Sequence, residues 1–467
     1  MKTTRLLIAA ALLTVTAATA RDYNDSTRRR ERRESGEIML VIDGDEQDPE
    51  IYEFGSPEKL RDHLRERKIE HDESKLKATM QVTEVVPDGH QHAEAPAFIF
   101  TQKENKFSFA LGGFINLRTS YDFNGTVSNI DFVTADIPIP GNYATKQQLI
   151  MDASTSRFYL AAVANSRALG EIDVYIDIDF RGGTGYSSGV TNRYTPRLRR
   201  AYVSFLGLTM GRDITTFCDL NAAPTTIDFQ GPNAYSFNYA TLIRYQYTFC
   251  DEHLTAAIAL EQPNVSATYD TAFEAIPQRV PDVPMYLQYQ FGRKLTSHLR
   301  ASAVLRDMYA YNATTDENTS LLGWGVQMSG RLVPSHWMGF CFNATYGEGI
   351  TPYIQDFIGL GLDFTPDPSN PNSIQTMPMY AWQAALDFKF TDRLTATGGY
   401  STAQIKKKGG YYADDEIRKT QYMFGNLFYS VTPRLVVAAE YIHGTRKNMN
   451  CLSNYANRAS LMAQFSF

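Results

Sequence analysis

From Phe98 to the C-terminus, apolar and polar residues alternate in short segments that are separated by turn residues. In residues 171–180, the even positions are apolar and four of the five odd positions are acidic. Alternation with a period of two predicts half-buried β-strands. Sixteen such segments occur, at residues 106–122, 156–165, 169–180, 196–206, 208–215, 239–249, 253–261, 283–292, 297–310, 321–332, 336–346, 379–390, 393–403, 417–431, 434–444 and 455–467.

The connections between these segments alternate in length, with seven short turns and eight long loops. A barrel of sixteen strands with both termini on one side needs seven turns on that side and eight on the other. Short periplasmic turns, long outer loops and an even strand count are typical of outer-membrane barrels. The loops of a soluble sandwich have no reason to sort by length. The pattern therefore predicts an all-β fold, a 16-stranded antiparallel transmembrane β-barrel over residues 98–467.

Two further features favour a membrane barrel. Strands of about ten residues, tilted near 45°, match the hydrocarbon thickness of a bilayer. The last strand alternates and ends in Phe467, which resembles the assembly signal of outer-membrane barrels. In such a barrel, the apolar face of each strand points to lipid and the polar face points to the lumen.

The N-terminus predicts export from the cytoplasm into an oxidising compartment. Lys2 and Arg5 flank the start of an apolar stretch at residues 6–15, and Ala18-Thr19-Ala20 is a small-residue cleavage site. Residues 1–20 therefore predict a signal peptide.

Residues 21–97 are charged and contain only three aromatic residues. We expect them to form a periplasmic extension that is partly helical or disordered. Ser56 followed by Pro57 is typical of a helix start, which predicts a helix over residues 57–70. Residues 39–42 predict a short strand.

Charge and hydropathy exclude two other classes. The chain of 467 residues has a net charge of −6, and nucleic-acid partners usually require a basic face. No stretch after the signal peptide has about 18 consecutive apolar residues, which excludes a helical membrane protein. The partners that we expect are outer-membrane lipid, further copies of the chain and small hydrophilic solutes.

The alternation places charged residues of both signs on the lumenal face. Arginine remains charged and binds carboxylates and phosphates in a bidentate manner, and rings of charged side chains select solutes by sign. The charges could instead pair with each other and brace the wall, and this alternative stays open for each residue. The predicted basic residues are Arg118, Arg157, Arg200, Arg212, Arg244, Arg300, Arg306 and Arg331, and the predicted acidic residues are Glu171, Asp173, Asp177, Asp179, Asp387 and Glu440.

The third long loop, at residues 216–238, begins with a stretch that is too apolar for a loop surrounded by water. If it folds into the lumen it would narrow the channel, with Asp219, Asp228 and Phe229 as constriction residues. Packing on neighbouring outer loops is the alternative.

Residues 198–232 resemble a known family. The resemblance lies in Leu198–Phe205, Met210–Asp213, Thr216–Asp219 and Ala223–Pro232, which look like the corresponding residues of the DcaP-like outer-membrane porins. It implies a sixteen-stranded trimer that passes small anionic solutes such as dicarboxylates. Some of these porins carry an N-terminal periplasmic coiled coil, whereas residues 21–97 lack a sustained heptad pattern.

The sequence predicts no enzyme, no cofactor and no metal site. Gly185–Gly189 matches G-x-S-x-G, but the following residues do not predict the helix that a nucleophile elbow needs. His90 and His92 lie in a segment typical of a linker, and no P-loop, HExxH or dinucleotide motif occurs. The four cysteines form no CxxC motif.

Two alternative functions remain open. One is an outer-membrane barrel enzyme, such as a lipase or protease, which needs a nucleophile and a base that converge in space. The other is a secreted all-β binding protein, which would dissolve without detergent. A propeller would show an internal repeat of roughly 40 to 50 residues, and none is present.

Overall fold

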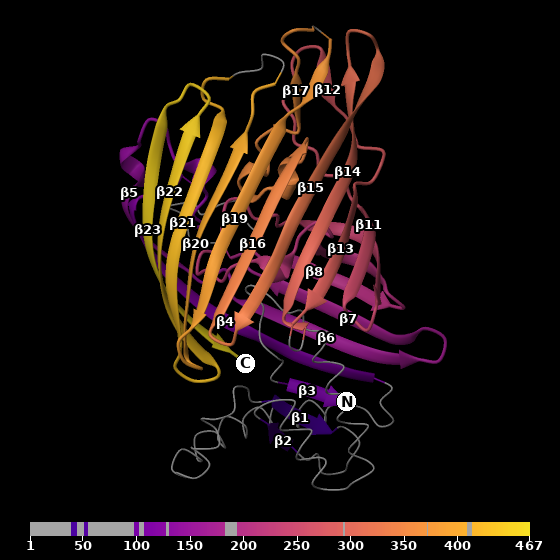
Figure 1. Cartoon of the computed structure of the whole chain (residues 1–467), viewed down its shortest axis with the longest axis vertical. Coiled ribbons are helices and arrows are strands. Elements are labelled where there is room, and N and C mark those ends of the chain that lie inside the picture. The colour runs from indigo at the N-terminus through magenta and orange to yellow at the C-terminus, as the bar shows by residue number, and fades with distance from the viewer. Residues whose placement is uncertain are drawn as a thin grey trace.

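In the part of the chain that the structure describes, sixteen antiparallel strands form a closed barrel (Figure 1). Each strand is hydrogen-bonded to the next, and β23 pairs with β4 to close the ladder. The predicted fold class is therefore confirmed. The expected signal peptide at 1–20 and helix at 57–70 lie outside the described residues. The computed structural model describes residues 39–43, 51–54, 98–101, 107–127, 130–182, 194–292, 295–370, 372–408 and 413–467.

Each of the sixteen predicted segments corresponds to one barrel strand. The barrel strands are β4 (Phe107–Asn124), β6 (Arg157–Ser166), β7 (Gly170–Asp179), β8 (Arg197–Phe205), β9 (Leu208–Ile214), β10 (Tyr239–Phe249), β11 (Leu254–Glu261), β13 (Val283–Phe291), β14 (Ser297–Asn312), β15 (Glu317–Ser335), β16 (Met338–Glu348), β19 (Pro378–Lys389), β20 (Leu394–Ile405), β21 (Ile417–Ser430), β22 (Leu435–Asn448) and β23 (Ser453–Ser466).

Two strands that pair with barrel strands lie in regions that the sequence assigned to loops. β5 (Lys146–Asp152) pairs with the upper half of β4, whose lower half pairs with β6. β12 (Phe273–Ala275) pairs with β14 above β13 in the same way. Each of them continues the pairing of a long strand beyond the end of its main partner. The alternation did not predict β5, because its inward residue Ile150 is apolar instead of polar.

Side chains are distributed as in a membrane barrel. Outward residues are apolar and exposed, for example Leu322 at 65% and Leu461 at 63%, whereas inward arginines such as Arg157 and Arg306 are buried. This reverses the order of a soluble protein, because lipid surrounds the outer wall of such a barrel. None of the helices in the described ranges is long and apolar enough to cross a membrane.

The two ends of the barrel differ, as Figure 1 shows. At the short-turn end the strands are joined by tight turns such as Leu206-Gly207, where both residues have positive φ, 50° and 80°. This is the backbone of a type I′ hairpin, which matches strand twist. The long-loop end carries short elements: η3 (Thr134–Asp136), η4 (Tyr143–Thr145), η7 (Thr351–Tyr353), η8 (Gln355–Phe357), β17 (Phe364–Pro366) and β18 (Ile374–Thr376).

A small sheet lies beyond the short-turn end (Figure 1). β3 (Phe98–Thr101) pairs with residues 108–111 of β4, which extend past the end of β23. β1 (Met39–Asp43) runs parallel to β3 and antiparallel to β2 (Ile51–Phe54). The predicted short strand at 39–42 is therefore present as β1.

Candidate functional site

The connection between β9 and β10, residues 215–238, lies inside the barrel and is called the inner loop. It contains the short η5 (Leu220–Ala222). Phe217, Ala222 and Ala234 are fully buried. The burial explains why this loop is apolar, because its side chains pack against the inner surface of the barrel instead of water.

Neutral side chains on the far side of the lumen bind the inner loop. Asn233 donates to Thr420 Oγ1 at 2.8 Å and accepts from Ser401 Oγ at 2.5 Å. Gln327 Nε2 donates to Ser236 Oγ at 2.6 Å and to Thr345 Oγ1 at 2.8 Å. We call the inward side chains Gln327, Ser329, Thr345, Ser401 and Thr420 the neutral wall. They come from β15, β16, β20 and β21, so the loop crosses the lumen from β9.

Carboxylates secure both halves of the inner loop. Glu440 of β22 accepts backbone hydrogen bonds from Ile227 and Asp228, both at 2.9 Å. Asp219 accepts from Ser329 Oγ, and its Oδ2 lies 2.8 Å from Nε2 of His298. Glu440, one of the predicted acidic lumen residues, therefore anchors the inner loop.

The two acidic loop residues differ in their ionisation. Burial opposes ionisation of Asp219, but the hydrogen bond from His298 and the charge of Arg300 outweigh it and lower its pKa. Burial raises the pKa of Asp228, and the neighbouring carboxylate Asp131 adds to this effect. Arg118 of β4 offsets it in part, with Nη1 3.7 Å from Asp228 Oδ1.

Arginines gather on β6 and β8, opposite the neutral wall. Arg200 donates to Asp177 Oδ2 at 3.0 Å, and Arg197 Nε donates to Asp179 Oδ1 at 3.0 Å. Arg199 Nη1 lies 3.5 Å from Asp177 Oδ2, and its Nε donates to the hydroxyl of Tyr239 at 2.7 Å. We call Arg157, Arg197, Arg199 and Arg200 the basic wall.

A β-bulge places two consecutive arginines on the same side of the wall. The pairing of β7 with β8 shifts between Asp177, which opposes Arg200, and Ile178, which opposes Leu198. Arg199 is the extra residue of the bulge. Strict alternation predicted Arg200 alone and therefore missed Arg199.

Phe229 of the inner loop faces this wall. The guanidinium carbons of Arg181, Arg197 and Arg199 lie 4.3, 5.9 and 5.8 Å from the centre of its ring. A gap of ≈ 20 Å³ separates Arg199 from the loop around Phe229 and Pro232. The ring of Phe229 therefore lies between the rest of the inner loop and the arginines.

Arg157 differs from its neighbours. It is 1% exposed, and all three of its guanidinium nitrogens lack a hydrogen-bond partner among the described residues. Its guanidinium lies 5.2 Å from the ring centre of Phe114. Its charge is therefore not neutralised by a bound carboxylate.

Three more of the predicted basic residues, Arg244, Arg300 and Arg331, bind neighbouring groups. Arg244 pairs with Asp213 at 2.6 Å, and Arg331 pairs with Asp387. Arg300 donates to the carbonyl of Thr216 and lies 3.5 Å from the ring centre of Tyr286.

Arg306 and Arg118 each form ion pairs with two aspartates near the long-loop end. Arg306 pairs with Asp282 and Asp363, both at 3.0 Å. Arg118 lies 3.4 Å from Asp152 and 3.5 Å from Asp131. These ion pairs agree with the alternative in which the lumenal charges pair with each other and stabilise the wall.

Arg212 is not where the alternation predicted. It pairs with Ala201 of β8 and Thr241 of β10, both on the outward face, and its Nε donates to the carbonyl of Leu198. Gly211, with φ of 135°, precedes it, and the sequence of β9 alternates poorly. Glu171 is exposed at the start of β7, and Asp173 is half-buried two residues further on.

The remaining sequence predictions concern the cysteines and possible metal or catalytic motifs. All four cysteines are free, with Cys218 and Cys341 buried and Cys250 and Cys451 exposed. The described residues hold no group of three or more His, Cys, Asp or Glu residues arranged to bind a metal. The G-x-S-x-G segment at 185–189, His90 and His92 lie outside the described residues.

The model of the family described as DcaP outer membrane protein matches residues 99–467. The chain belongs to the DcaP outer membrane protein family. With the barrel above, this membership makes the protein an outer-membrane porin located in the bacterial outer membrane. A search of curated proteins gives no match.

One solved structure supports the fold, and two further porins are more distant matches. The outer membrane channel DcaP of Acinetobacter baumannii matches with a TM-score of 0.67 at 21% identity, covering 78% of this chain and 99% of that chain. OmpT of Vibrio cholerae matches at 11% identity over 78% and 99%, with a TM-score of 0.49. An anion-selective porin from Comamonas acidovorans matches at 12% identity over 77% and 100%, with a TM-score of 0.49.

Proposed function

We propose that this DcaP-family porin passes small hydrophilic anions, dicarboxylate-like solutes, by diffusion through a charged lumen that the inner loop narrows. The inner loop narrows the lumen, and Phe229 marks the narrow point. One observation supports this most directly. Three guanidinium groups of the basic wall, Arg197, Arg199 and Arg200, share two carboxylates, Asp177 and Asp179, whereas the fourth, Arg157, makes no ion pair among the described residues.

Arg157 supplies an excess charge in this arrangement. Its side chain is buried, so its field is screened less than that of an exposed charge. An anion gains from that field, and a cation is repelled by it. Because a guanidinium matches a carboxylate in shape, the wall suits carboxylate-bearing solutes.

Planar-bilayer recordings of the purified full chain under a salt gradient test the proposal. We expect stepwise channels whose reversal potential has the anion-selective sign. Arg157→Gln removes a charge without stranding a carboxylate, so it should fold normally and lower the anion preference several-fold. Arg393→Gln, in a turn at the short-turn end, is the matched control.

A cation-selective reversal potential in the unmodified protein would overturn the proposed selectivity. Equal anion preference in Arg157→Gln and Arg393→Gln would show that Arg157 does not contribute to the selectivity. Permeation of succinate, measured as current in its sodium salt, distinguishes a dicarboxylate pathway from a chloride pathway.

Assembly as a homotrimer is also proposed, and it rests on the family resemblance alone. Native mass spectrometry in detergent tests it, with a mass of three chains expected. Channel steps that occur in threes would agree with that mass. We also propose that residues 21–97 lie in the periplasm, and the position of β1 and β2 beyond the short-turn end supports this (Figure 1).

A further inference from the structure

A row of directly paired residues runs across the outer surface of ten strands. Directly opposite residues of neighbouring strands share one face of a sheet. Val326, Tyr346 and Ile258 of this row are 47%, 41% and 49% exposed, so the row faces outward. The row, called the outer row, consists of Tyr245, Ile258, Met285, Ala303, Val326, Tyr346, Tyr380, Gln404, Lys419 and Lys447.

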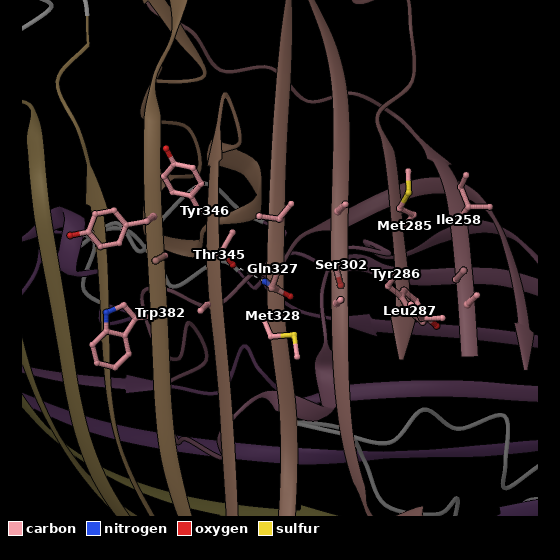
Figure 2. Close-up of a pocket in the computed structure, with 18 of the residues that line it drawn as sticks. Ile258, Met285, Tyr286, Leu287, Ser302, Gln327, Met328, Thr345, Tyr346 and Trp382 are labelled. Atoms are coloured by element: carbon pink, nitrogen blue, oxygen red, sulfur yellow. Dashed lines mark hydrogen bonds between the residues drawn. The ribbon is translucent and has the colours of Figure 1, made fainter. Parts of the chain in front are cut away.

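The apolar half of the outer row borders a groove of ≈ 1010 Å³ in the outer wall. Figure 2 shows Tyr346 and Trp382 on one side of it, Met285 and Leu287 on the other, and Met328 between them. Small residues form its floor, because β14 and β16 contribute Ala301, Ala303 and Ala344. The volume lies at the upper end of the range for small-ligand sites.

The other half of the row ends in unpaired positive charge. Lys419 lies directly opposite Lys447, and like charges in that position destabilise a sheet. Neither lysine makes an ion pair among the described residues, whose paired lysines are Lys389 and Lys408. Two adjacent ammonium groups without a carboxylate indicate a place for a bound anion.

Tyr380 joins the two halves. Its side chain lines the groove, and the ammonium of Lys406 lies 5.3 Å from the centre of its ring. Lys406 follows the last residue of β20, on the same edge of the barrel as Lys419 and Lys447. The charged group and the apolar groove are therefore one continuous surface.

The dimensions of this surface suit a lipid molecule. From Lys419 on β21 to Val326 on β15 the row crosses four strand spacings, about 19 Å at about 4.8 Å each. The lysines lie at the long-loop end, which is the extracellular end in barrels of this type. Basic residues at that level attract anionic lipid head groups.

We propose that the outer row binds one lipid of the outer leaflet whose head group carries phosphate. The phosphates lie between Lys419 and Lys447, with Lys406 alongside. The acyl chains follow the row past Tyr380 into the groove over Ala303 and Ala344. A second copy of this chain fits less well, because its outer wall is convex and its own lysines would add to the unpaired charge.

The experiment uses the full chain in detergent with lipid A as the probe, and native mass spectrometry measures the lipid-bound fraction. We expect the unmodified protein to bind lipid A and the double variant Lys419→Gln/Lys447→Gln to bind about tenfold more weakly. Both substitutions remove like-charge repulsion, so the barrel should remain folded. Lys389→Gln at the short-turn end is the matched control and should bind as the unmodified protein does.

A second pair of variants tests the groove. Ala344→Phe fills its floor and should lower lipid A binding several-fold. Ala439→Phe is the matched control, since Ala439 is also an exposed outward alanine but lies on β22, away from the groove. Resistance of the barrel to sodium dodecyl sulfate at room temperature confirms folding of all variants.

Four results would overturn the proposal. The first is unchanged binding in Lys419→Gln/Lys447→Gln, and the second is equal binding by Ala344→Phe and Ala439→Phe. The third is inorganic phosphate that competes as strongly as lipid A at equal phosphate concentration, because the acyl groove would then contribute nothing. The fourth is an altered number of copies in Ala344→Phe with lipid binding intact, which would make this face a contact between copies.

Discussion

The two sides of the lumen differ in chemistry and in what they contact. The neutral wall holds the inner loop with hydroxyl and amide groups, for example Ser401 and Thr420 on Asn233. The basic wall contacts the other side of the loop mainly through guanidinium groups that lie over Phe229. Neutral hydrogen bonds fix a backbone without adding net charge, whereas unbalanced arginines create a field. One wall therefore positions the loop, and in the proposed function the other wall acts on the solute.

The largest effect should come from breaking an ion pair of the basic wall. Arg200→Gln leaves Asp177 buried with one fewer guanidinium, and removing one partner of a buried pair costs about 3–5 kcal/mol. Arg157→Gln removes a charge with no partner and should cost far less. Urea unfolding of the two variants, followed by tryptophan fluorescence, measures the difference.

The double variant Arg200→Gln/Asp177→Asn is the control for this prediction, because it removes both charges and should recover most of the loss. A similar loss for Arg157→Gln and Arg200→Gln would mean that Arg157 has a partner of its own.

The second effect concerns a carboxylate beside the neutral wall. Asp356 accepts a hydrogen bond from Thr134, and burial raises its pKa from 3.8 to about 6. The raised pKa means that the folded chain holds this proton more tightly than the unfolded chain. The resulting stability is complete below about pH 4 and is lost as the pH rises through 6.

At pH 7 the charged Asp356 therefore costs up to about 3 kcal/mol. Asp356→Asn should unfold at a higher temperature than the unmodified protein at pH 7, and the difference should disappear by pH 4. Thermal unfolding at several pH values measures this. A difference that is independent of pH would contradict the assigned pKa.

The third effect tests the anchor of the inner loop. Asn233→Ala removes two hydrogen bonds to the neutral wall, which costs about 1–2 kcal/mol. We expect greater current fluctuation in single-channel recordings and an unchanged sign of the reversal potential. A change of sign would show that the neutral wall also sets selectivity.

The smallest effect comes from the ring on the basic wall. Cation–π contacts contribute about 1 kcal/mol, so Phe229→Ala should change the stability little. It should widen the gap beside Arg199 and raise the conductance by less than about twofold. Phe249→Ala is the control, because Phe249 stacks on Tyr247 at 6.0 Å and does not line this gap. Equal conductance in the two variants would place the narrow point elsewhere.

Much of the fold is predictable from local pattern, and parts of the site are not. The alternation of β7 gave the inward positions of Asp177 and Asp179, because the side-chain period of a strand is two. It failed at Arg199, where a bulge inserts an extra residue. It also failed at Arg212, and it did not indicate that Glu440 would bind the backbone of the inner loop.

The sequence by itself determined the barrel, its strand count and the two kinds of connection, because lipid outside and water inside force alternation along every strand. It also indicated that the loop after β9 is too apolar for water. Only the tertiary structure decided which charges are neutralised. Ion pairs such as Arg306 with Asp282 and Asp363 join residues from separate strands and loops. Such pairs depend on distances of a few ångströms between residues that are far apart in the sequence. No local pattern along the chain encodes these distances.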